Sequence, residues 1–393
     1  MKKYLCLLLI FCLTLCGCGR RQPDIVPDTP PTQPTQQTTE PTSGEVPTEP
    51  SPVYDQIPMV AISLPPITES ITADDGNLIC SITYQGIELS IPDQNVADQI
   101  ILRYQNRQAA QLQSANAISL LAQDSYHSGD TWTPYFFDIT YSPARIDHNV
   151  LSLFGKTVQF TGGNHPYTEC SALNYNMLTG EWLTLGSILT NVSAKQSLCS
   201  ALIESAGKVA QEKQLYDDYP QIIEQRFAKE ESYDEDWFFS TTGLCFFFSP
   251  YEIAPYVSGS VVIEVPYDQL SGIIDDSFFP PEEDQSVGTL CIQNAKDVDY
   301  QKFSQIAQIT TCDDGDTAFL YAAGLIRDIQ IFSANGTPIF RTFALSPGDG
   351  IKLTADFSQE YHISYRNDNE TVNELIRFEI QDGSFSLNSY NPE

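Results

Sequence analysis

The fold is decided by residues 78–91, which read LICSITYQGIELSI. Apolar and polar side chains alternate along this stretch, which is typical of half-buried β-strands. Gly86 lies between two such runs and predicts a hairpin turn there. After this stretch, apolar residues recur at helical spacing: Ala97, Ile100, Ile101, Tyr104, Leu112, Ala115 and Ile118. The change from strand period to helix period predicts a sheet with one face covered by a long helix.

The same alternation extends outward in both directions. Asn95 followed by Asp98 predicts the start of the helix, which we expect to end near Gln123. Further strands are expected over segments that are rich in β-branched and aromatic residues: 60–64, 135–141, 150–160, 246–248 and 261–265. Ser193 followed by Gln196 repeats the helix-start signal and opens a second helical region that is interrupted near Pro220. The sequence therefore predicts an antiparallel α+β body, divided into modules 54–165 and 166–275.

The last part of the chain predicts a different architecture. Residues 275–285 are rich in Asp, Glu and Pro and look like a connection. After them, short alternating segments are separated by turn sequences such as Asn335-Gly336 and Asp382-Gly383. The segments cover residues 326–332, 338–343, 351–353, 361–365, 375–380 and 384–387. A small all-β, sandwich-like module is expected over residues 286–393.

The first residues are typical of an export signal. Lys2 and Lys3 precede an apolar run that is too short for a permanent membrane span, and small residues follow it. Leu15-Cys16-Gly17-Cys18 resembles a lipobox, so residues 1–17 are predicted to be cleaved and Cys18 to carry a lipid. An ordinary cleaved signal is the alternative. Residues 18–53 are rich in Pro, Thr and Gln and are expected to be a disordered tether. The predicted location is the extracytoplasmic face of the cell membrane.

The charge of the chain restricts its partners. The formal charge is −31, and loss of Lys2 and Lys3 with the signal takes it to −33, with 18 basic residues against 51 acidic ones. Such a surface repels nucleic acid and anionic polymers, whereas it suits a basic protein or a neutral glycan. The alternative is that acidity only keeps an exposed protein soluble.

Cysteines beyond Cys18 stand at positions 80, 170, 199, 245, 291 and 312. Their even number permits disulfides in an exported chain, and Cys291 with Cys312 is the expected pair. No Cys-x-x-Cys spacing occurs, so we expect neither a structural zinc site nor redox chemistry.

Several motifs together resemble a known extracellular module. They are Gly162-Gly163-Asn164-His165-Pro166, Leu173-Asn174-Tyr175-Asn176, Tyr251-Glu252-Ile253-Ala254-Pro255-Tyr256 and Val265-Pro266-Tyr267. Residues 55–275 resemble the paired extracellular domains of lysozyme-sensing, RsiV-like anti-sigma factors and of PdaC-like peptidoglycan deacetylases. The resemblance implies a module that binds lysozyme outside the cell. It does not extend to the last module.

The chain also departs from both groups of relatives. A lipid-anchored chain leaves no cytoplasmic part to hold a sigma factor, so direct transcriptional signalling is not expected. The residues that follow the module lack the His pairs and Asp of a metal-dependent deacetylase. We therefore expect no enzymatic activity, no cofactor and no metal. A carboxylate-dependent hydrolase is a third hypothesis, and it is supported only by the abundance of acidic residues.

The candidate ligand-binding residues are His165, Tyr251, Glu252, Tyr256 and Trp237. His165 lies in a turn-like motif, where orienting the turn is the alternative to ligand contact. Glu252 lies between aromatic residues that could shift its pKa, or it could be held by backbone amides at a bend. Trp237 belongs to 233–239, which, like 216–219, combines acids with rings that could grip a cationic protein or a sugar. Solvated loops are the alternative there.

An acidic turn formed by Asp313, Asp314 and Asp316 has oxygen ligands suited to calcium, but it lacks the spacing of a calcium-binding loop. The leading hypothesis is a lipid-anchored, non-enzymatic surface protein that recognises a basic envelope-acting protein such as a lysozyme-like muramidase. The alternative is a protein that binds cell-wall glycan or assists wall maintenance without catalysis.

Overall fold

The structure is a computed structural model and describes residues 59–228, 236–280, 288–367 and 370–391. These residues belong to one compact unit. The predicted signal, Cys18 and the tether lie outside the described ranges. Within those ranges, no helix is both long enough and apolar enough to cross a membrane.

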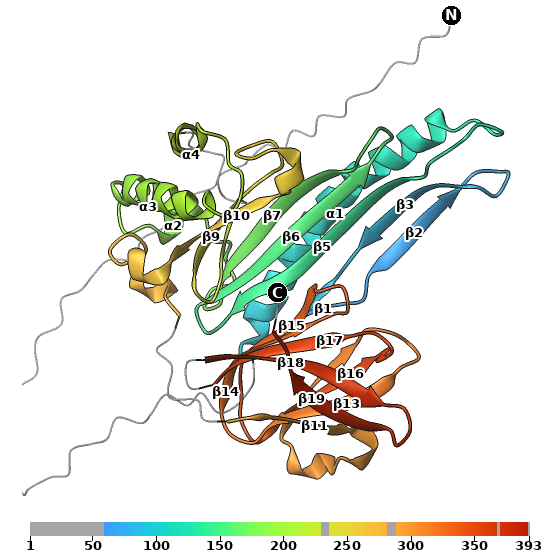
Figure 1. Cartoon of the computed structure of the whole chain (residues 1–393), viewed down its shortest axis with the longest axis vertical. Helices are drawn as coiled ribbons and strands as arrows, with labels where there is room; N and C mark the ends of the chain where they lie inside the picture. Colours follow the sequence, from blue (N-terminus) through green and yellow to red (C-terminus); the bar gives the residue numbers. More distant parts are fainter. Residues whose placement is uncertain (1–58, 229–235, 281–287, 368–369, 392–393) are drawn as a thin grey trace, which may run out of the picture. The chain divides into compact units, whose positions relative to one another are not determined.

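The body is built on a five-stranded sheet with the order β2-β3-β5-β6-β7. Its strands are β2 (Ile67–Thr72), β3 (Leu78–Tyr84), β5 (Tyr135–Ile146), β6 (Val150–Phe160) and β7 (Tyr167–Asn176). Neighbouring strands run antiparallel, except that β3 and β5 run parallel. The helix α1 (Gln94–Ser125) lies between β3 and β5 in the sequence. Figure 1 shows α1 lying along one face of this sheet, as the sequence predicts.

Helix α1 begins slightly earlier than expected. Its N-cap is Asp93, whose carboxylate accepts hydrogen bonds from the amides of Asn95 at 2.9 Å and Val96 at 3.3 Å. The predicted start at Asn95 was therefore wrong, because the cap that pairs with the first free amides lies before it. The predicted apolar face is correct, and Ile100 and Tyr104 are almost completely buried against the sheet.

A second, three-stranded sheet packs against the strands β6 and β7. It has the order β10-β9-β8, with β8 (Trp237–Phe239), β9 (Gly243–Phe248) and β10 (Val261–Pro266). Three helices cover its other side: α2 (Leu185–Ile188), α3 (Ala194–Val209) and α4 (Tyr219–Ala228). Short 3-10 turns follow at η1 (Tyr256–Ser258), η2 (Tyr267–Gln269) and η3 (Asp276–Phe278).

The helix-start signal at Ser193 is used differently from the prediction. Ser193 is the N-cap of α3, but its side chain makes no capping hydrogen bond. The Asn191 side-chain oxygen accepts from the Ala194 amide at 3.1 Å instead, and the Ser193 hydroxyl donates to that same oxygen at 2.6 Å.

The C-terminal region is all β and forms two sheets around one core. The four-stranded sheet has the order β11-β13-β16-β12, with β11 (Leu290–Asn294), β12 (Gln305–Thr310), β13 (Asp316–Ala322) and β16 (Asp349–Ala355). The larger sheet contains β14 (Ile326–Phe332), β15 (Pro338–Leu345), β17 (Tyr361–Asn367), β18 (Glu370–Glu379) and β19 (Ser384–Ser389). Turns η4 (Ala295–Asp297) and η5 (Tyr300–Lys302) precede β12. The predicted α+β fold class with a C-terminal β region is confirmed.

Two strands from the start of the chain complete the larger sheet. Its seven-stranded order is β19-β18-β17-β14-β15-β1-β4, with β1 (Val60–Ser63) and β4 (Ile87–Ser90) at one edge. The hairpin expected at Gly86 is therefore not formed, because β3 pairs in one sheet and β4 in another. The chain turns between them at Gln85, whose carbonyl accepts from the Tyr104 hydroxyl at 2.6 Å. Helix α1 thus fixes the point where the chain changes sheet.

Strand β1 is shared by two hydrophobic cores. Val60 and Ile62 point into the core between the two C-terminal sheets, whereas Ala61 points into the core under α1. Alternate residues of a strand face opposite sides, so the four-residue strand β1 contributes side chains to both cores. The C-terminal β region and the body are therefore joined by common strands as well as by the chain connection.

Candidate functional site

The segment Tyr251–Tyr256 follows β9 and forms a tight loop that divides its residues between core and surface. Ile253 and Ala254 are buried, at 0% and 1% exposure. Tyr251 has a φ of 71°, and its amide donates to the Ala254 carbonyl at 3.0 Å. A non-glycine residue at positive φ costs free energy, so surrounding contacts must hold the loop. The two buried residues provide this anchor, and they leave the tyrosines at the surface.

Three of the predicted binding residues meet in one group of rings, which we call the tyrosine-histidine cluster: His165 and Tyr251, which are exposed, and Tyr256, which is half-buried. The His165 and Tyr256 ring centroids lie 4.2 Å apart, and those of Tyr251 and Tyr256 lie 5.5 Å apart with planes at 28°. The Tyr256 hydroxyl donates to the Pro166 carbonyl at 3.2 Å. Tyr251 is 60% exposed. The cluster therefore presents stacked rings to solvent on a fixed backbone.

Glu252 is held in place by neighbouring groups. Its Oε1 accepts from Arg226 Nη1 at 2.7 Å, and its Oε2 accepts from the Ser249 amide at 3.0 Å. Burial raises the pKa of the Glu252 carboxyl above its usual value, although the Arg226 guanidinium and the Ser249 amide oppose the shift. Arg226 also pairs with Asp236. Glu252 thus orients the loop. This agrees with the alternative interpretation of Glu252 in the sequence, a carboxylate that backbone amides hold at a bend.

Arg226 was missed by the sequence analysis. It lies on α4, stacks over the Phe248 ring at 4.8 Å and joins Glu252 to Asp236. One cation between two carboxylates leaves this part of the surface negative. A single arginine in a strongly acidic stretch was the available signal, because a partly buried acid requires a cationic partner.

A groove lies beside Tyr256, with a volume of about 480 Å³. Its walls come from the end of β9, from η1 and β10, and from the face of β6 and β7 that is opposite α1. Val257 is 88% exposed at its rim, and Lys156 contributes a cation. Cys170 lines it, and its thiol donates to the Ser260 hydroxyl at 3.4 Å, while burial raises the pKa of the Cys170 thiol. The groove enlarges the contact surface that the rings provide.

Trp237 is not part of this surface. It is completely buried in β8, where its ring packs edge-on against Phe239 at 5.2 Å. Its carbonyl accepts from the Asn174 side-chain amide at 2.8 Å. The prediction of Trp237 as a binding residue was wrong, because the ring occupies the core between the three-stranded sheet and the helices. Tyr233, in the same predicted segment, lies outside the described residues.

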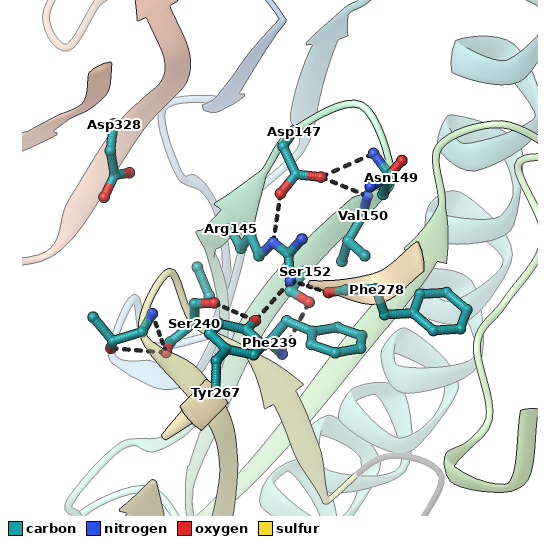
Figure 2. Close-up of polar contacts among 12 residues, drawn as sticks. Arg145, Asp147, Asn149, Val150, Ser152, Phe239, Ser240, Tyr267, Phe278 and Asp328 are labelled. Atoms are coloured by element: carbon teal, nitrogen blue, oxygen red, sulfur yellow. Dashed lines mark hydrogen bonds and ion pairs between the residues drawn. The ribbon is translucent and has the colours of Figure 1, made fainter. Parts of the chain in front are cut away.

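Figure 2 shows the most strongly buried charged group, Arg145 with Asp147. Arg145 is 1% exposed, and its Nε donates to Asp147 at 2.6 Å. Its Nη1 donates to the Tyr267 hydroxyl at 2.6 Å and to the Phe278 carbonyl at 2.8 Å. Burial opposes the charge of Arg145, but Asp147 and Tyr267 outweigh it and the Arg145 pKa is raised. This group joins β5 to η2 and η3, so it supports the body from inside.

The predicted cysteine pair is not formed. Cys291 and Cys312 are both free thiols. Cys312 lies beside Gly315 at the start of β13, whereas Cys291 is the register partner of Tyr321 near its end. Six residues of strand cover about 20 Å, and a disulfide requires Cα atoms within about 7 Å. The sequence separation is short, but the strand between the two cysteines keeps them apart.

Asp313 and Asp314 are exposed in the turn before β13. In the described ranges, no group of three or more His, Cys, Asp or Glu side chains is arranged to hold a metal ion. The tyrosine-histidine cluster itself can offer a binding partner contact area, ring stacking and hydrogen-bond acceptance.

Comparisons with known proteins find a similarity for part of the body. Residues 188–268 match the family described as Protein of unknown function (DUF3298). A solved structure of a DUF3298 family member from Bacteroides fragilis NCTC 9343 is 15% identical, covers 56% of this chain and 94% of its own, and has a TM-score of 0.40. A DUF3298 family protein from Pseudomonas aeruginosa PAO1 is 16% identical, covers 57% and 99%, and has a TM-score of 0.39. No curated protein matches. Residues 188–268, which include α3, α4, Tyr251 and Tyr256, are therefore a segment similar to the DUF3298 family.

Proposed function

We propose that this chain is a lipid-anchored, non-enzymatic surface protein whose tyrosine-histidine cluster binds a basic envelope-acting protein. A lysozyme-like muramidase is the candidate partner. In this proposal, the Cys18 lipid holds the protein on the extracytoplasmic face of the membrane, and residues 18–53 form the tether.

The observation that carries the proposal is the arrangement of rings within an acidic surface. Exposed tyrosines on a rigid backbone lose little side-chain entropy on binding, which is why aromatic residues dominate binding energy at interfaces. Tyr216 donates its amide to the Ile253 carbonyl at 2.9 Å, which brings the exposed Asp217 and Asp218 to the same loop. Together with a net charge of −31, these acids favour encounter with a cationic partner.

The test is a binding titration of the soluble chain from Gly19 with a basic lysozyme, at low and at high salt. The Tyr256→Ala variant is expected to weaken binding by about tenfold or more, as a central aromatic contact does. Tyr390→Ala is the matched control. Tyr390 follows β19 and, like Tyr256, stacks on a histidine ring, His362, with ring centroids 4.3 Å apart. Equal affinity of both variants and wild type, or no binding at low salt, would contradict the proposal.

The groove beside Tyr256 favours the second candidate, binding of wall glycan, since a hollow next to a half-buried ring suits a sugar. Salt separates the two candidates. Binding to a basic protein weakens as salt screens the charges, whereas retention on purified peptidoglycan through stacking does not. Salt-insensitive retention that requires Tyr256 would favour the glycan.

A further inference from the structure

The two C-terminal sheets differ in width, and this leaves part of the larger sheet uncovered. Four strands face seven, and the smaller sheet ends at β12. Beyond β12 lies a groove of about 550 Å³, which we call the edge groove. It is lined by residues of β1 and β4 on the larger sheet and by residues 305–308 and 310 of β12.

The floor of the edge groove is the inner face of β1 and β4. Val60 is the register partner of Ser90, and Ile62 is the partner of Glu88. Paired residues on antiparallel strands share a face, so Glu88 and Ser90 point to the same side as the two core residues. Val60 and Ile62 belong to the core between the sheets. The floor is therefore apolar along β1 and carries one carboxylate on β4.

The wall of the edge groove is an open strand edge. In the described ranges, β12 pairs with β16 alone, in parallel register. The amides of Gln305 and Thr311 donate to the carbonyls of Gly348 and Thr354. In a parallel ladder, alternate residues point their backbone groups to opposite sides. Ile306, Gln308 and Thr310 therefore direct their N–H and C=O groups away from β16 and toward the edge groove.

We propose that the edge groove binds an extended segment of a partner polypeptide, which adds to β12 as a fifth strand of the smaller sheet. An open edge offers backbone donors and acceptors in a row, and only another peptide backbone matches that spacing. The side chains of the added strand that face the floor belong to one set of alternate positions. Those over Val60 and Ile62 are apolar, and the one against Glu88 is basic. The inference goes beyond the proposed function, because it assigns a second surface that does not involve the tyrosine-histidine cluster.

The charge of the chain selects the partner. Among the described residues that line the edge groove, Glu88 is the single charged one. The segment of this chain that precedes β1 fits poorly, since residues 22–58 contain no Lys or Arg and many prolines. Proline cannot donate a backbone hydrogen bond to a strand ladder. A basic segment of another protein meets both requirements, the free backbone and the carboxylate.

The test uses a blocked eight-residue peptide with a fluorescent label, in which valine, lysine, valine and valine occupy one set of alternate positions and threonine occupies the others. It is titrated into the soluble chain from Gly19. This chain contains the whole compact unit Val53–Glu393. Gln308→Pro removes an N–H that points into the groove and leaves the β16 side intact, so it should weaken binding by about tenfold or more. Gln308→Ala keeps the N–H and should bind as wild type does. Glu88→Gln should weaken binding at low salt, whereas Glu360→Gln, which changes an exposed acid elsewhere, should not.

A second measurement covers the case in which Gln308→Pro fails to fold. The same peptide with an N-methyl group on every residue has no backbone N–H to donate at either edge and should not bind the wild-type chain. Tyr251→Ala should leave peptide binding unchanged, which separates this test from that of the proposed function. Equal binding of both peptides would overturn the proposal. Peptide binding that appears only when the chain begins at Val53 would also overturn it, because the tether would then be the occupant. A dimer of the chain that Gln308→Pro dissociates would do the same, because a second copy would then be the occupant.

Discussion

The Thr342 hydroxyl donates a hydrogen bond of 2.8 Å to the carbonyl of Met59, and both residues are buried although 283 positions separate them. The contact lies where β1 pairs with β15, with Val60 opposite Thr342. The first described strand of the chain is therefore an internal part of the sheet that the last residues build. The fold of the C-terminal β region depends on residues that precede it by more than two hundred positions.

This dependence predicts that residues 286–393 do not fold alone. Without β1, the edge of β15 and the core residues Ile331 and Phe340 lose their cover. The isolated fragment should show no cooperative thermal transition by circular dichroism, whereas residues 54–393 should show one. A cooperative transition of the fragment would mean that β1 and β4 are dispensable.

The buried pair Arg145 and Asp147 predicts a large loss of stability when one partner is removed. Arg145→Met leaves an unpaired buried carboxylate, which should lower the free energy of unfolding by about 3–5 kcal/mol. The exposed pair of Lys208 and Glu204, 3.9 Å apart, is the control, and Lys208→Met should cost less than about 1 kcal/mol. The double variant Arg145→Met/Asp147→Asn should cost less than the sum of its single variants in urea unfolding. Similar costs for Arg145→Met and Lys208→Met would refute the supporting role of Arg145.

His148 predicts a pH dependence of stability. Its ring meets Phe343 edge-on at 5.3 Å, and burial lowers the His148 pKa below the model-compound value of 6.5; Asp147 opposes this shift and Arg327 adds to it. Because the unfolded chain takes up the proton first, the folded state loses stability as the pH falls through and below the usual histidine range. His148→Gln should remove this loss between about pH 7.5 and about pH 5. The exposed His127→Gln serves as the control, and identical pH profiles of wild type and His148→Gln would contradict the prediction.

The cysteines predict an order of alkylation. Cys291 and Cys312 are half-buried free thiols, whereas Cys170, Cys199 and Cys245 are buried and their pKa values are raised by burial. A less available thiolate reacts more slowly, so iodoacetamide should modify Cys291 and Cys312 first in the native protein. Mass spectrometry of a digest reads this directly, and a peptide linking Cys291 to Cys312 would contradict the structure.

The sequence predicted those parts of the fold that depend on local pattern. The helical spacing of Ile100 and Tyr104 places α1 correctly, and 326–332 is the whole of β14. The partner of a strand is not a local property. The alternation of Val60 and Ile62 shows that two faces differ, but not that β1 joins a sheet formed by residues near 340. The hairpin expected at Gly86 failed for the same reason.

The candidate site was predicted in part. The Tyr251–Tyr256 motif and His165 do meet, although 86 residues separate His165 from Tyr251, because β7 and the loop after β9 lie together. Trp237 was misassigned, since composition does not distinguish an aromatic ring in the core from one at the surface. Arg226 and Tyr167 were missed. Tyr167 is 52% exposed beside Glu169, and its pKa is raised by partial burial and by Glu169 and Glu252.

The most direct test of the proposed function is a hydrogen–deuterium exchange footprint of the soluble chain with and without a basic lysozyme. Slower exchange is expected in residues 165–167 and 251–258 when lysozyme is present, and unchanged exchange is expected in β17 and β18. Protection that avoids both of these segments, or the absence of any change at low salt, would contradict the proposed function.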